Sequence, residues 1–370
     1  MHKSTTVKKN LYVESLRGIA IILVVFGHII GSDNTGGMKV ADHSIFRYLY
    51  FSLEYIRLPL FTVISGWVYA NRPIFFYNRN VFLRNKIRRL LIPLITVSTL
   101  LFLLRIVTPG TNSSPEFSDI WKNIFFPYDI YWYIYSLFII FLGIIVIDSQ
   151  PFFHSLKGWA ITLVASLCLL FISSAYLEAV PNFFSFKGAI YLFPFFLFGI
   201  SLFRYKKIIL KKGYEIGLAI LFLIGIGIQQ LSWFGVLPLQ GRISILAFVV
   251  GVSGVYLLFR LRLKSNMLIW IGQYAYEIFL FHVFFTGGTR IALLRMGIEN
   301  KWAILVLALM ISILIPILLQ KLFSQSGLLS LLFLGRSLKN KKRSSIPVSS
   351  TPNLRNPSSE ELLENSMASK

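Results

Sequence analysis

Long apolar stretches recur along the 370-residue chain, and clusters of polar residues separate them. A helix needs about 20 apolar residues to cross the hydrocarbon core of a membrane, and most of these stretches approach that length. The pattern therefore predicts an all-α, polytopic membrane protein, a bundle of about ten transmembrane helices. The predicted spans are 11–31, 49–70, 90–107, 131–147, 158–175, 188–203, 214–231, 243–259, 267–286 and 302–322.

The loops between these spans alternate between basic and poorly charged. If the N-terminus is cytoplasmic, the basic clusters at 72–89, 204–212 and 260–264 all lie on the cytoplasmic side. On the opposite side, the loop 108–130 has only Lys122. Lys and Arg accumulate in cytoplasmic loops because they set the orientation of insertion. With an even number of spans, both termini are predicted to be cytoplasmic.

Composition agrees with this interpretation. Hydrophobic residues make up 55% of the chain and charged residues 14%, against about 25% charged in soluble proteins, which excludes a water-soluble globule. The net charge of +22 would point to nucleic acid in a soluble protein, but here the loop bias accounts for it, so no nucleic-acid partner is predicted. Residues 1–343 are expected to form one membrane domain, and 344–370, rich in Ser, Pro and Asn, a disordered cytoplasmic tail.

The first predicted span contains two ionisable side chains, Arg17 and His28. Such groups are costly in a membrane unless they are paired or face water, so each is a candidate functional residue. Their separation is close to three helical turns, which places them on one face, about 16 Å apart along the axis. This geometry suits an elongated anion with its reactive end near His28. The structural alternatives are that Arg17 pairs with Glu14 and that His28 bonds a neighbouring helix.

The second span contains Glu54 and Arg57, which lie three residues apart and are predicted to neutralise each other. A basic segment with Lys86 and Arg89 follows at the cytoplasmic surface. It either binds the phosphates of a nucleotide-bearing donor or sets the orientation and contacts anionic lipid, and charge alone does not separate these interpretations.

In the ninth span, His282 is expected at a depth similar to that of His28, on the same side of the membrane. Two such histidines are also compatible with axial ligation of a haem, although the chain has no haem attachment motif. No metal site and no bound cofactor are predicted. The single cysteine, Cys168, lies among Leu and Ser and is expected to be an inert thiol.

With these residues assembled, the chain resembles acyltransferase family 3, membrane O-acyltransferases that modify surface and secreted saccharides. The similarity runs from about residue 10 to 325, along all ten spans. Three positions depart from the family pattern: Lys86 replaces an arginine, Ala275 a serine and Phe279 a tyrosine. The matching elements are Arg17 and His28 as Arg-x10-His, Pro59 to Gly66 as Pro-Leu-Phe…Ser-Gly, Lys86 to Arg89 followed by Pro93, Trp132 in Tyr-Trp-Tyr-Ile, and Gly272 to His282.

The resemblance implies that acetyl, or another short acyl group, passes from acyl-CoA to a hydroxyl of a cell-surface or secreted saccharide. It resembles the single-domain members, including those related to fucose acetylases, which implies a multi-pass protein of the bacterial inner membrane. Acyl-CoA, a saccharide or glycolipid acceptor and membrane lipid are the expected partners. The implied roles are His28 as general base, with Arg17 and His282 also catalytic; Lys86, Arg89 and Ser65 in donor binding; and Trp132 and Glu277 along the substrate channel.

Several alternatives remain open from the sequence. Ten spans with few polar residues also suit a secondary transporter or flippase for a saccharide or lipid-linked substrate, although no inverted repeat is evident. An acyl-enzyme on Ser65 or on His28 is compatible with the same residues. The acceptor, the acylated position, the acyl group and the oligomeric state are not determined by the sequence.

Overall fold

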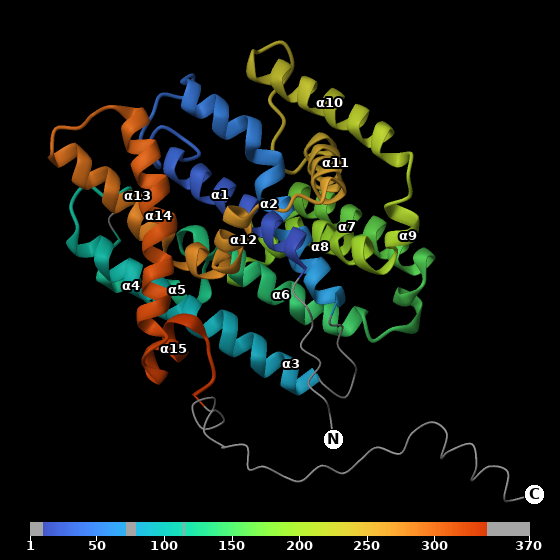
Figure 1. Cartoon of the computed structure of the whole chain (residues 1–370), viewed down its shortest axis with the longest axis horizontal. Coiled ribbons are helices and arrows are strands. Elements are labelled where there is room, and N and C mark those ends of the chain that lie inside the picture. The colour runs from blue at the N-terminus through green and yellow to red at the C-terminus, as the bar shows by residue number, and fades with distance from the viewer. Residues whose placement is uncertain (1–9, 72–78, 114, 339–370) are drawn as a thin grey trace, which may run out of the picture. The chain divides into compact units, whose positions relative to one another are not determined.

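The computed structural model describes residues 10–71, 79–113 and 115–338. The predicted tail 344–370, its boundary at 343 and the basic residues of 72–78 lie outside the described residues. Within the described part, the regular elements are all helices (Figure 1). The long ones are α1 Leu11–Ile30, α2 Ile45–Asn71, α4 Ile92–Val107, α6 Trp132–Ile147, α7 Leu156–Tyr176, α8 Phe186–Arg204, α10 Tyr214–Trp233, α11 Ile245–Leu261, α13 Ala275–Arg295 and α14 Lys301–Phe323.

Nine predicted spans each coincide with one of these helices, whereas the span 267–286 runs over the short α12, Asn266–Gln273, and the first part of α13. Shorter elements precede two of the long helices. α3 Arg79–Lys86 and a π-helical turn at Ile87–Leu91 lead into α4, and α12 precedes α13. Eight helices of the described residues are long and apolar enough to cross a membrane. α11 is shorter, at 17 residues, and α2 is less apolar because Glu54 and Arg57 lie within it. The chain is thus an all-α polytopic membrane protein.

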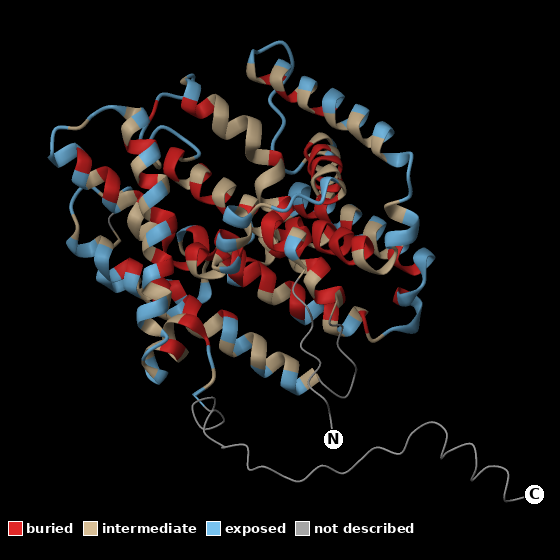
Figure 2. Cartoon of the chain, in the orientation of Figure 1, coloured by how far each residue is buried: buried red, intermediate tan, exposed pale blue. Residues whose placement is uncertain are grey.

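Burial separates central helices from peripheral ones. In α1, 67% of the most apolar segment is buried inside the protein, against 17% in α10. Figure 2 shows the same contrast between α1 or α8 and the largely exposed α10. Side chains such as Ile216 and Leu223 on α10 are exposed although they are apolar, as expected for a face that contacts lipid.

Small residues allow the central helices to approach closely. A Cβ at Gly66 on α2 would fall on the carbonyl oxygen of Phe196 on α8, and a Cβ at Gly199 on α8 would fall on that of Val63. These reciprocal contacts bring the two backbones together, which is how membrane helices gain packing energy without a hydrophobic drive between them. α2 and α8 therefore form a rigid pair that holds the rest of α2 in place.

A proline explains the irregular start of α4. Proline has no N–H, so Pro93 cannot donate to the carbonyl of Arg89, four residues earlier. The hydroxyl of Tyr276 on α13 donates to that carbonyl instead. The π-helical turn at Ile87–Leu91 and α13 are thereby joined at one point.

A buried ion pair joins three helices at the end of the bundle away from His28. Asp148, which follows α6, is almost inaccessible and accepts a 2.7 Å hydrogen bond from the Tyr69 hydroxyl of α2. Arg204, at the end of α8, approaches the same carboxylate to 2.7 Å. The pair fixes the ends of α2, α6 and α8 relative to one another.

Candidate functional site

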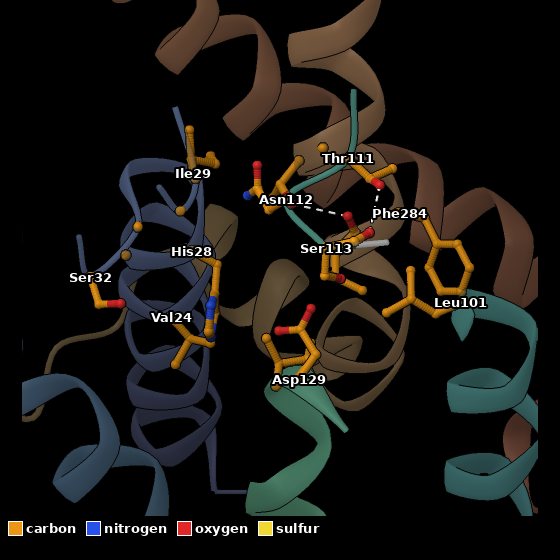
Figure 3. Close-up of a pocket in the computed structure, with 18 of the residues that line it drawn as sticks. Val24, His28, Ile29, Ser32, Leu101, Thr111, Asn112, Ser113, Asp129 and Phe284 are labelled. Atoms are coloured by element: carbon orange, nitrogen blue, oxygen red, sulfur yellow. Dashed lines mark hydrogen bonds between the residues drawn. The ribbon is translucent and has the colours of Figure 1, made fainter. Parts of the chain in front are cut away.

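A cavity of about 730 Å³ opens where α1 ends, and His28 lies on its wall. Figure 3 shows His28, on the last turn of α1, and Asp129, just before α6, directed into the same space. The other walls come from α2, the end of α4, the segment 108–113, the loop 234–244 and α13. By the predicted topology, this is the outer side of the membrane.

The loop after α1 is ordered by its own polar residues. The Asp33 carboxylate accepts hydrogen bonds from the backbone N–H groups of Thr35 and Gly36, both at 3.0 Å. The hydroxyls of Thr35 and Ser32 also donate to it, and these bonds lower the pKa of Asp33 to about 2. The glycines that follow are therefore held at the cavity wall by a turn that stays intact at neutral pH.

Two arginines brace the segments over the cavity. Arg290 of α13 is buried and donates to the carbonyl of Gly37, to the carbonyl of Gly110 at 2.8 Å and to the side-chain oxygen of Asn112 at 2.5 Å. Arg105 of α4 forms an ion pair with Asp129. Both guanidinium groups satisfy backbone or carboxylate oxygens of loops, so the rim of the cavity is tied to α4 and α13.

His28 and His282, predicted to lie at a similar depth, are in contact, with ring centroids 5.3 Å apart. His282 is fully buried, and its Nδ1 lies 2.9 Å from the carbonyl oxygens of Ile278 and Phe279. A carbonyl can only accept, so Nδ1 carries the hydrogen, and in the neutral ring Nε2 presents a lone pair. Among the described residues this Nε2 is buried without a hydrogen-bond partner.

Arg57 lies beside His28, and its environment differs from the one predicted. The expected pairing with Glu54 is wrong: no carboxylate of the described residues lies within 4 Å of Arg57. Its guanidinium instead donates to the Tyr50 hydroxyl and lies 4.0 Å from the centroid of that ring. It also packs on Gly27, where a Cβ would collide with it. The glycine next to His28 therefore makes room for a cation at the cavity wall.

Aromatic side chains form the deep wall of the cavity. Trp132 and Tyr133, at the start of α6, line it together with Phe279 of α13. The Tyr133 and Phe279 rings are 5.4 Å apart, and Phe279 lies 6.0 Å from the His282 ring. The space near the histidines is therefore bordered by aromatic side chains on one side and by arginines on the other.

The remaining predicted site residues lie away from this cavity. Arg17 forms a 2.9 Å ion pair with Glu14, which was the structural alternative. Lys86 packs with its ammonium 3.4 Å from the centroid of Phe141, whereas Arg89 is exposed. The Ser65 hydroxyl donates to the Phe61 carbonyl within α2. Glu277 pairs with Arg336 at 3.7 Å. Their proposed roles stay predictions.

Sequence reasoning missed several cavity residues. Arg290 was placed in a loop after a span ending at 286, whereas α13 continues to Arg295 and buries this side chain. Arg105 and Arg242 looked like ordinary charges at span ends or in loops. The only signal in the sequence is that these arginines fall on the side that is otherwise poor in basic residues.

The site combines a histidine pair, an aromatic wall and arginines around a cavity large enough for a saccharide. Among the described residues, no group of three or more His, Cys, Asp or Glu side chains is placed to hold a metal ion. A protein-family model described as an acyltransferase domain matches residues 10–321 of the chain. No curated protein and no solved structure matches it significantly.

Proposed function

The chain belongs to acyltransferase family 3, and from this premise we propose that it transfers an acetyl or other short acyl group from acyl-CoA to a saccharide hydroxyl. The acceptor occupies the cavity beside His28, and the protein resides in a bacterial inner membrane. The observation that carries the proposal is the position of His28 on the wall of a saccharide-sized cavity, next to a second, buried histidine.

His28 is proposed as the general base. A sugar hydroxyl is a weak nucleophile at neutral pH, and a neutral imidazole within hydrogen-bond reach removes its proton as the new C–O bond forms. The hydroxyl oxygen attacks the thioester carbonyl, the C–S bond breaks, and the imidazolium returns the proton to the departing CoA thiolate. The products are the sugar ester and CoA, and His28 ends as it began.

His282 is proposed to support this step from its place next to His28. Its Nδ1 donates to two helix carbonyls, so Nε2 is the ring atom that remains as an acceptor. That lone pair can hold the His28 ring in one tautomer or accept a hydrogen bond from the substrate. We therefore assign His282 a role next to the reacting atoms and His28 the proton transfer itself.

The donor is proposed to approach from the opposite end of α1. Arg17 lies on the same helix about three turns before His28, and Arg89 is exposed on the same side of the membrane as Arg17 in the predicted topology. Arginine binds phosphate through two parallel hydrogen bonds, so Arg17 and Arg89 are the better candidates for the CoA phosphates. Lys86 contributes a charge nearby, and Ser65 contacts the acyl arm.

Transfer of labelled acetyl from acetyl-CoA into envelope saccharide tests the proposal. Membranes that contain the protein should label saccharide, and membranes without it should not. Mass spectrometry of the envelope glycans from both cell types should show an added acetyl mass only when the protein is present. No transfer across a broad panel of acyl donors and acceptors, with a saccharide accumulating on one side of vesicles instead, would favour the transporter. A Soret absorption band in the purified protein would revive the haem alternative.

A further inference from the structure

The cavity beside His28 carries an excess of positive charge. Four arginines line it, namely Arg57, Arg105, Arg242 and Arg290, and the acidic residue among the lining side chains is Asp129. Charged groups at a partly enclosed site are costly unless something compensates them. The partners of each arginine therefore show which of these charges are left for a ligand.

Two of the four are already used by the protein. Arg105 forms its ion pair with Asp129 and donates to the Tyr128 hydroxyl at 3.3 Å. Arg290 directs its N–H groups at the carbonyls of Gly37 and Gly110 and at Asn112. These side chains hold the rim together and have little donor capacity to offer.

Arg57 and Arg242 are different. Among the described residues, neither has a carboxylate within 4 Å, and Arg57 donates a single hydrogen bond, to the Tyr50 hydroxyl. Arg242 is exposed in the loop before α11, and no hydrogen bond from it is formed within the described part. Both side chains line the same cavity, so the two arginines without a carboxylate partner border one space.

We infer that the acceptor carries an oxyanion, a carboxylate or a phosphate, which binds between Arg57 and Arg242. This inference rests on the proposed function and names the class of its acceptor. Guanidinium groups pair with either anion through charge-assisted, bidentate hydrogen bonds. Arg57 also packs on Gly27, the residue before His28. An anion at this point orients the sugar so that a neighbouring hydroxyl reaches the histidine.

The inference is tested by measuring the binding of three probes that share the glucose ring: glucose, glucuronic acid and glucose 1-phosphate. Equilibrium binding to the purified full-length protein in nanodiscs should be about tenfold tighter for at least one acidic probe than for glucose. Which acidic probe binds better identifies the anion as carboxylate or phosphate. Raising the salt concentration should weaken the binding of the acidic probe and leave the binding of glucose unchanged.

Arg242→Gln is the decisive variant because the side chain is exposed and forms no hydrogen bond with the residues that the structure describes. It should reduce the affinity of the acidic probe to that of glucose, and Arg242→Lys should give an intermediate loss. Arg295→Gln removes the same charge from an exposed position at the end of α13, outside the cavity, and should change nothing. Equal losses in Arg242→Gln and Arg295→Gln, or no preference for either acidic probe, would overturn the inference.

A fourth probe separates the acceptor from the donor. Adenosine 3′,5′-bisphosphate carries the phosphates of the CoA nucleotide, and its binding should not depend on Arg242. If it competes with the acidic sugar and loses affinity in Arg242→Gln, the oxyanion belongs to the donor and the acceptor assignment fails. Binding does not require catalysis, so His28→Ala should keep the anion preference. If binding depends on Arg242 but no acyl transfer is detected, the proposed function is rejected and the anion-binding site still stands.

Discussion

At the residue scale, His28 and His282 are held very differently although their rings are neighbours. His282 is inaccessible and fixed by two carbonyls of its own helix, whereas His28 lies at the cavity wall beside the small Gly27. The sequence was sufficient to predict that the two histidines lie at a similar depth, since both fall near one end of their spans, but not that their rings are in contact. It did not predict Arg57 beside them, because spacing along α2 favoured a bond to Glu54. The side chain instead donates to Tyr50, two turns earlier on α2, and packs on Gly27 of α1.

The basic residues before α4 give a prediction at this scale. Arg89→Gln should raise the KM for acyl-CoA several-fold, because Arg89 is exposed and forms no ion pair within the described part of the chain, so its charge can meet a phosphate. Lys86→Gln should instead reduce protein abundance, because its ammonium packs on Phe141. Arg84→Gln, an exposed neighbour on α3, is the control for loss of charge. Donor kinetics of Arg89→Gln that equal those of Arg84→Gln would leave the segment with a role in orientation only.

At the element scale, hydrophobic periodicity was enough to find the spans, because lipid selects long apolar helices whatever their neighbours are. The ends of the helices were less predictable. α13 continues nine residues past the predicted end at 286, to Arg295. The added turns contain Arg290, whose carbonyl partners lie in two loops that a local pattern cannot reveal. The Arg89 carbonyl, which Pro93 leaves without an N–H donor, is likewise satisfied by Tyr276, far away in sequence.

The contact between α2 and α8 gives a prediction for an element. Gly66→Ala places a methyl group on the Phe196 carbonyl, so the helices must separate. Overpacking of this kind costs about 1–3 kcal/mol, which should appear as a lower thermal unfolding temperature in detergent. Gly143→Ala on α6 is the matched control, because a Cβ there meets nothing within 4 Å. Equal unfolding temperatures for the two variants would contradict the close packing.

At the scale of the whole molecule, function depends on orientation in the membrane. The cavity and the exposed Arg89 lie toward opposite ends of the predicted topology, so donor and acceptor would enter from different sides. The sequence predicted this separation through the basic loops. It did not predict a cavity rich in arginine on the outer side, because the fold brings those residues together from α2, α4, α13 and a loop.

Labelling of single cysteines tests the orientation. In a Cys168→Ser background, Ser118→Cys should react with an impermeant maleimide in intact cells, because position 118 is exposed in the predicted outer segment. Asn80→Cys, exposed on α3, should react only after the cells are opened. Ready labelling of Asn80→Cys from outside would reverse the topology and separate Arg89 from cytosolic CoA.

The most direct test of the central claim is the rate of acetyl transfer by His28→Ala. Alanine is tolerated in membrane helices, so the variant should insert, and its abundance is matched to that of the parent by blotting. Loss of a positioned general base should lower transfer from labelled acetyl-CoA by about 10²–10⁴-fold, with binding of the acceptor retained. His282→Ala, measured alongside, should retain more activity than His28→Ala. Near-normal transfer by His28→Ala at equal abundance would contradict the assignment of His28 as the base.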